Sequence, residues 1–238
     1  SRYVKVNRTI NYYTIDTVSS ITYRTSTNLL IKESDLINQE FNYTKCPVFN
    51  HRTSRVFIGV SPIDFSFMIE RKPSHPIKVH CDESISHLLV YDNEHLLSPH
   101  PVVQLKFPKH MFWTTDDDIW FEMYDHPITS YSNNFIAVSG WFNLSNWSRM
   151  SNLGMTVVDE SKPVVIKKGD PLFRIAFHSQ NPNDSFTLKE ERNSNVISKV
   201  QSAYDKMYSQ KQSEESVINR LFSKTDSKSK CPVSFLFK

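Results

Sequence analysis

Histidines are concentrated in the middle of the chain, so a transition-metal site is the first chemistry to consider. Cys81 stands directly beside His80, and imidazole and thiolate groups are the ligands that zinc prefers. The spacing does not support such a site, because no HxH, HExxH or CxxC pattern is present. We interpret each histidine as a buried, hydrogen-bonded or exposed side chain, and we predict no metal and no cofactor. The set is His75, His80, His87, His95, His100, His110 and His126.

An acidic run is the second candidate. Asp116–Asp118 is followed by Glu122 and Asp125 in a stretch rich in Trp, Phe and Tyr. Carboxylate oxygens of this kind bind Ca²⁺ or Mg²⁺. Three consecutive aspartates cannot all face one way, however, and the run lies between two expected strands. We therefore interpret it as a solvated turn.

Nucleophilic and phosphate-binding patterns are missing from the sequence. The four glycines are isolated, so there is no GxSxG, GxGxxG or GxxxxGK[ST] motif. The three cysteines, Cys46, Cys81 and Cys231, have no catalytic signature around them. We predict no catalytic residue, and a non-enzymatic protein is favoured over an enzyme.

Two segments near the end of the β-rich region carry a family resemblance. Residues 140–149 read GWFNLSNWSR, and residues 162–177 read KPVVIKKGDPLFRIAF. The first fits a Gly-x-Phe-x-x-x-x-Trp-x-Arg pattern, and the second a Lys-x-Gly-Asp-Pro turn before an apolar strand. Over about residues 107–177 the chain resembles uncharacterised proteins of tailed bacteriophages. The residue types alone, without the resemblance, predict a positive-φ turn at Gly169 and large buried areas at Trp141 and Trp147.

The turn at Gly169 is also similar to the end of the β-clip fold of dUTPases and dCTP deaminases. This resemblance implies a homotrimer with a nucleotide pocket between subunits. The chain lacks the Gly-Arg-Ser-Ser phosphate-binding motif of those enzymes, so the resemblance reaches the fold and not the catalysis. The residues that it would place in the pocket are Asp125, His126, Asn146 and Arg149.

Short apolar or alternating runs dominate the first 180 residues and predict about a dozen strands. Residues 65–69 and 173–177 alternate with period 2, so one face of each strand would pack inward. We expect a mainly β protein, with a β-sandwich or a β-clip or jelly-roll-like domain at 1–180. A short helical appendage is expected at 185–224, as two amphipathic helices that dock on the β-domain. A linker and an apolar peptide follow at 225–238, and the peptide would dock either on its own domain or on a neighbouring protein.

Composition and charge argue against two classes of binding partner, nucleic acids and membranes. A net charge of +3 from 28 basic and 25 acidic residues, spread along the chain, disfavours specific nucleic-acid binding. No apolar run is long enough to span a bilayer, so we expect no membrane association. The odd number of cysteines leaves at least one thiol free, which favours synthesis in a reducing interior. Under the phage resemblance, that interior is the host cytoplasm.

The first hypothesis is a non-enzymatic phage virion component, a capsid decoration or accessory structural protein acting by protein–protein contacts. It would be a homo-oligomer located in the virion and bound to other virion proteins, above all the major capsid protein. Aromatic anchors and an apolar terminal peptide would make the contacts. A nucleotide-binding or nucleotide-hydrolysing protein with a dUTPase-like fold is the alternative, and a phage-encoded inhibitor of a host enzyme or signal is the third. The expected partner-binding residues are Phe235, Leu236, Phe237, Trp141 and Trp147.

Overall fold

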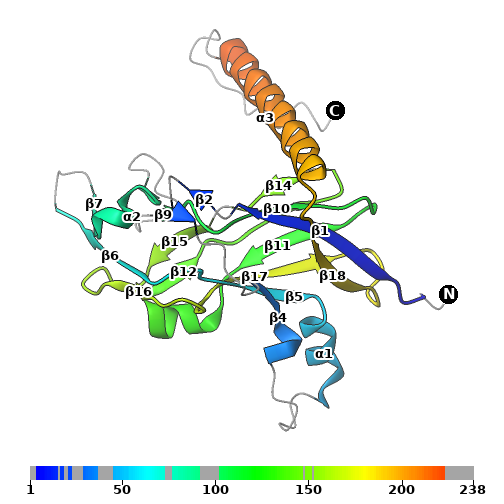
Figure 1. Ribbon diagram of the computed structural model, residues 1–238, viewed down its shortest axis with the longest axis horizontal. Coiled ribbons are helices and arrows are strands. Elements are labelled where there is room, and N and C mark those ends of the chain that lie inside the picture. The colour runs from blue at the N-terminus through cyan, green and yellow to red at the C-terminus, as the bar shows by residue number, and fades with distance from the viewer. Residues whose placement is uncertain are drawn as a thin grey trace. The chain divides into compact units, whose positions relative to one another are not determined.

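The computed structural model describes residues 4–15, 17–18, 21–22, 29–36, 45–72, 77–91, 102–146, 148–151 and 153–222. The chain divides into two compact units, Ser1–Glu191 and Arg192–Lys238. The first unit is built from β-strands and the second contains one long helix (Figure 1). No helix within the described ranges is both long enough and apolar enough to span a membrane.

The described strands of the first unit form five sheets. In spatial order, sheet I contains β14 (Arg149–Met150), β10 (Lys109–Trp113), β1 (Asn7–Ile15) and β18 (Ser185–Glu190). Sheet II contains β13 (Gly140–Asn143), β11 (Trp120–Tyr124), β17 (Pro171–His178), β5 (Val56–Val60) and β4 (Leu30–Lys32). Sheet III contains β12 (Phe135–Ala137), β15 (Leu153–Val157), β9 (Val102–Leu105) and β8 (Leu89–Tyr91). Sheet IV contains β16 (Val164–Ile166), β6 (Phe65–Glu70) and β7 (Lys78–Cys81), and sheet V contains β2 (Thr17–Val18) and β3 (Ile21–Thr22).

Short helical segments join some of these strands. The 3₁₀ turn η1 (Glu33–Leu36) and helix α1 (Pro47–Thr53) lie between β4 and β5, and both contact β5. Helix α2 (Glu83–Ser86) follows β7 and is capped by Asp82, whose side chain accepts a hydrogen bond from Ser84 N. The π-helical turn η3 (Thr129–Asn133) precedes β12.

An aromatic core joins sheets I and II. Phe177 of β17 lies within 5.8–6.2 Å, between ring centroids, of Phe112 and Phe186 from sheet I and Phe57 and Phe121 from sheet II. Aromatic rings bury more area than other side chains, and pairs at these separations attract one another beyond that burial. Two sheets that pack face to face through such a core make a β-sandwich, so the expected mainly β class is confirmed.

The beginning and the end of the first unit meet in sheet I. β18 runs parallel to β1, with Asn7 opposite Ser185, and β10 pairs with the other edge of β1 (Figure 1). The buried carboxylate of Asp184 accepts hydrogen bonds from Val6 N and Arg8 Nε. Burial alone would raise the pKa of Asp184, but hydrogen bonds led by that from Arg8 outweigh it and lower the pKa.

The turn before β17 has the conformation expected from the sequence. Gly169 adopts φ +88°, a region that glycine occupies without steric cost. Asp170 closes the turn by accepting hydrogen bonds from Lys167 N and Asn133 Nδ2. β17 then runs through sheet II between β11 and β5, antiparallel to both.

The C-terminal region differs from expectation in two ways. Residues 185–190, predicted to be helical, form β18, so the β unit extends to Glu191 rather than 180. Parallel pairing with β1 satisfies their backbone, and Phe186 enters the aromatic core. A single 29-residue helix, α3 (Ser194–Phe222), replaces the two short ones. The polar stretch 210–216 does not interrupt α3, because Gln, Lys and Glu are good helix formers.

His110 of β10 is a titratable side chain held inside the core. It is fully buried between Tyr12, Phe112 and Phe173, and its Nδ1 lies 2.8 Å from Thr14 Oγ1. Its Nε2 has no hydrogen-bond partner in the described part of the chain. Burial lowers the pKa of His110 to about 3, so the folded protein keeps this imidazole neutral.

His110 is expected to make the protein sensitive to mild acid. The unfolded chain protonates it near the ordinary value of 6.5, whereas the folded chain does so only near pH 3. The contribution of His110 to the free energy of unfolding is therefore fully present above pH 6.5. It falls as the pH drops towards 3, by about 2 kcal/mol between pH 7 and pH 5. Urea unfolding at pH 7 and pH 5 measures this loss. We expect the loss of unfolding free energy between the two pH values to be about 2 kcal/mol smaller in His110→Phe than in the wild type. Equal acid losses in the two proteins would contradict this role.

Candidate functional site

The outer face of sheet II carries the candidate site. Phe121 and Phe177 point into the core, so the residues that alternate with them on β11 and β17 point outward. Cross-strand pairing places Trp120 opposite His178 and Glu122 opposite Trp141. Three strands thus bring four large side chains together on one surface, which we call the Trp pocket. It is an open depression of about 430 Å³, lined by Trp120, Glu122, Trp141 and His178 and by Phe121, which lies between Trp120 and Glu122 on β11.

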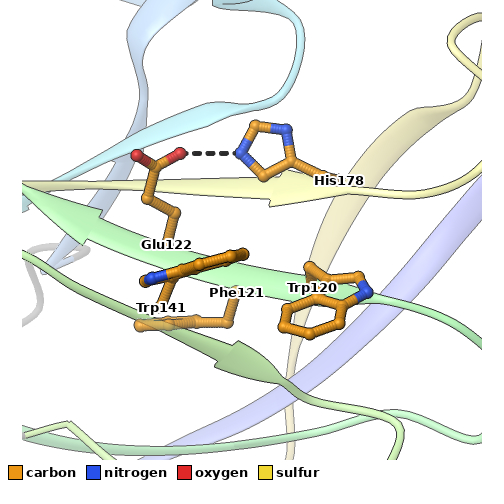
Figure 2. A pocket seen from close by; sticks show the side chains of 5 residues that line it. All are labelled: Trp120, Phe121, Glu122, Trp141 and His178. Atoms are coloured by element: carbon orange, nitrogen blue, oxygen red, sulfur yellow. Dashed lines mark hydrogen bonds and ion pairs between the residues drawn. The ribbon is translucent and has the colours of Figure 1, made fainter. Parts of the chain in front are cut away.

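The two tryptophans form the apolar part of the pocket. Their ring centroids are 5.3 Å apart and their planes are inclined by 35°. Figure 2 shows the two indoles among the five side chains that line the pocket. Trp120 Nε1 lies 3.3 Å from Asp118 Oδ1, to which it donates a hydrogen bond that holds the indole in place. Trp141 is 75% exposed, so the large buried area predicted for it from the sequence is wrong, because its side chain lies on the outer face of sheet II.

The polar part of the pocket is a carboxylate–imidazole pair. His178 Nε2 lies 2.8 Å from Glu122 Oε2, the contact dashed in Figure 2, and both side chains are about half exposed. Exposed pairs of this kind contribute little to folding stability. Among the described residues, Glu122 Oε1 and His178 Nδ1 have no hydrogen-bond partner. A ligand can therefore form hydrogen bonds with the carboxylate oxygen Oε1 of Glu122 and with the ring nitrogen Nδ1 of His178.

Asp125 and His126, predicted to bind a ligand, are engaged in the turn after β11. Asp125 Oδ1 accepts hydrogen bonds from Thr129 Oγ1 at 2.7 Å and from Ala137 N at 2.9 Å. His126 Nδ1 accepts one from Ile128 N at 3.3 Å. Burial lowers the pKa of His126, and the nearby positive charge of Arg174 adds to that effect. These contacts give both residues a structural role in the chain.

An ion network that the sequence did not indicate lies beside His126. Glu33 of η1 is buried and pairs with Arg174 Nη2 at 2.7 Å. Its second oxygen lies 3.3 Å from Arg52 Nη1, without the alignment of a hydrogen bond. Arg174 also lies over the ring of Tyr124, 5.9 Å from its centroid. The network fastens η1 and α1 to sheet II.

The other two predicted ligand residues lie elsewhere. Asn146 is exposed in the turn after β13, where its N–H donates to Asn143 Oδ1. That turn lies at the start of β11, because Asn143 pairs with Trp120, whereas Asp125 follows the end of β11. Arg149 opens β14 in sheet I, opposite Phe112. The four residues do not form one site within a single chain, and the pocket between subunits stays a prediction.

The predicted partner-binding residues divide into two groups. Trp141 lies in the Trp pocket, on the surface. Trp147, Phe235, Leu236 and Phe237 lie outside the described residues.

The described residues contain no group of three or more His, Cys, Asp or Glu side chains placed to hold a metal ion. His80 pairs instead with Glu70 across β6 and β7, at 2.6 Å. In the acidic run, Asp118 adopts φ 57° in the bend before β11.

A scan against protein-family models finds no match for this chain, and a search of curated proteins finds no matching sequence.

Proposed function

We propose that the protein is a non-enzymatic accessory component of a tailed-phage virion, such as a capsid decoration protein, which binds a ligand through the Trp pocket. The observation that carries its role in binding is the exposure of Trp141. Three-quarters of this side chain is in water, on β13 at the edge of sheet II. An indole left in water adds little to folding, and burying it against a partner releases about 25 cal/mol for each Å² covered.

The surroundings of Trp141 also favour binding. Trp120 supports the indole from the next strand, and β13 and β11 are held in register by the Trp120–Asn143 and Met123–Gly140 pairs. A rigid aromatic anchor loses little conformational entropy when a ligand binds. Tryptophan is also among the residues that contribute most to binding energy at interfaces.

The proposed location rests on the family resemblance. The segment 140–149, which resembles tailed-phage proteins, is also the segment that contributes β13 and Trp141 to the pocket. Trp141 occupies an unspecified position of the Gly-x-Phe-x-x-x-x-Trp-x-Arg pattern, so the motif adjoins the candidate site and supports the proposed location rather than the pocket. For attachment to the particle we retain the apolar peptide Phe235, Leu236 and Phe237, with the major capsid protein as the proposed partner and a homo-oligomer as the proposed state.

The virion proposal predicts that the protein purifies with phage particles. Mass spectrometry of gradient-purified particles should find it at many copies, in a fixed ratio to the major capsid protein. Removing residues 231–238 should lower that ratio, because the apolar peptide provides the attachment. A chain that is abundant in infected cells and missing from particles would overturn the proposal and favour an inhibitor of a host enzyme or signal.

A further inference from the structure

We infer that the ligand of the Trp pocket is a neutral carbohydrate, with a pyranose ring on the exposed face of Trp141 and hydroxyl groups at Glu122 and His178. The inference rests on the proposed function, since it names the ligand of the same site.

The aromatic geometry favours stacking on one face. The Trp120 and Trp141 centroids are 5.3 Å apart, within the ~4.5–7 Å range of aromatic rings in direct contact. A ligand ring therefore has no slot between them and must lie on the free face of Trp141. The face of an indole is electron-rich, so it attracts the weakly positive C–H groups on the apolar face of a pyranose.

The polar pair suits neighbouring hydroxyl groups. Glu122 Oε1 is an acceptor, and His178 Nδ1 donates whenever that nitrogen carries a proton. A sugar hydroxyl both donates and accepts, so two adjacent hydroxyls can bond to the carboxylate and the imidazole at once. The 2.8 Å contact between Glu122 and His178 fixes the two groups beside each other before the ligand arrives.

Charge favours a neutral ligand over a nucleotide. The pocket lining contains no lysine or arginine, and its carboxylate Glu122 would repel a phosphate. Arg174, which lies on β17 together with the pocket residue His178, is paired with Glu33 at 2.7 Å. Phosphate recognition generally relies on such cations or on a helix N-terminus.

Size favours a small ligand over a protein surface. A pocket of about 430 Å³ lies within the ~300–1,000 Å³ of small-molecule sites. Among the described strands of sheet II, Trp141 is the one large hydrophobic residue that is exposed. A stable protein interface needs about 20–30 residues on each side, with a larger apolar centre than one indole.

Titration of the full chain with defined saccharides tests the inference. The probes are glucose, galactose, mannose and N-acetylglucosamine and their neutral oligosaccharides, followed by tryptophan fluorescence and calorimetry, with AMP and GMP as charged comparators. We expect saturable binding of at least one neutral saccharide. Trp141→Ala should weaken it about tenfold or more, which corresponds to ~1.4 kcal/mol. Glu122→Gln should weaken it several-fold, because the charge that strengthens the hydrogen bond is lost.

Tyr131→Ala is the matched control, since Tyr131 is a 90% exposed aromatic residue on η3, outside the pocket lining. It should bind saccharide like the wild type, and all variants should unfold at the same temperature. Failure of every saccharide to bind, or tighter Trp141-dependent binding of AMP or GMP, would overturn the carbohydrate inference.

Phage carrying Trp141→Ala separates this inference from the proposed function. An unchanged copy number in purified particles supports a pocket that is free for a small ligand. A reduced copy number with the wild-type chain present in particles would make Trp141 a contact to a virion protein, which overturns the carbohydrate inference and keeps the virion proposal. Absence of the wild-type chain from particles would overturn the virion proposal alone, because saccharide binding is measured on the purified chain.

Discussion

Replacing Phe177 by alanine is expected to lower the free energy of unfolding by about 4 kcal/mol. The ring is fully buried and touches phenylalanines of both sheets, Phe112 and Phe186 on one and Phe57 and Phe121 on the other. Truncation removes the apolar contacts and leaves a cavity between two sheets that their hydrogen-bonded strands keep from closing. Urea unfolding followed by far-ultraviolet circular dichroism measures the change.

Trp141→Ala provides the comparison for Phe177→Ala, because it also removes a large aromatic ring from sheet II. Trp141 is 75% exposed, so this substitution should change the free energy of unfolding by less than about 0.5 kcal/mol. A loss of roughly 2 kcal/mol or more in Trp141→Ala would show that the indole contributes to the fold. A loss below about 1 kcal/mol in Phe177→Ala would contradict the aromatic core as the link between the two sheets.

Local sequence patterns are sufficient to predict the strands that alternate. Phe65–Glu70 shows buried and exposed residues in strict turn, and Leu172–Phe177 is the strand expected after the Gly169 turn. The pattern of Phe65–Glu70 reflects one buried face, which a strand imposes on its own sequence. The second strand buries residues on both faces, because Ala176, between Ile175 and Phe177, is buried as well. Gly169 is equally accessible to prediction, because few other residues tolerate a positive φ in such a turn.

Pairing between distant segments explains what the sequence does not reveal. Residues 185–190 have only Phe186 fully buried, so their identity as a strand depends on β1, nearly the whole length of the unit away in sequence. β10 reads Lys-His-Met-Phe-Trp, with three consecutive buried residues and no alternation. The buried histidine in that run owes its place to Thr14, Tyr12 and Phe173, all of them far from it in sequence, as well as to Phe112 on its own strand.

The candidate site is predictable from the sequence only in part, for the same reason. Trp141 is an expected partner-binding residue, whereas Trp120 and Glu122 stand out in the sequence only as surroundings of the acidic run. His178 has no local signal, because it lies 56 positions from Glu122 in sequence and joins it only through the register of β11 and β17. Asp125 and His126 have residue types that suit catalysis or binding, but the turn after β11 uses their polar atoms.

Glu33→Gln is expected to lower the free energy of unfolding by about 3 kcal/mol. Glu33 is buried, and its shortest contact is with Arg174, whose side chain is only 15% exposed. Loss of the carboxylate charge leaves a largely buried guanidinium without its counter-ion, and Arg174 Nε already has no partner among the described residues. Denaturant unfolding measures the loss, and Arg52→Gln is the control. Arg52 is 39% exposed, so water replaces its pairing and we expect a change below about 1 kcal/mol.

A double-mutant cycle decides whether pairing or packing underlies the effect of Glu33. Arg174→Met keeps the long apolar stem and removes the charge, so combined with Glu33→Gln it leaves no unpaired ion in the interior. If pairing dominates, the double variant is more stable than Glu33→Gln alone, and the two losses fall short of additive by ~1–3 kcal/mol. If the losses simply add, Glu33 and Arg174 stabilise the protein independently and the ion network does not join η1 to sheet II. The predicted shortfall follows from burial, because a charge removed from water gains more from its partner than an exposed charge does.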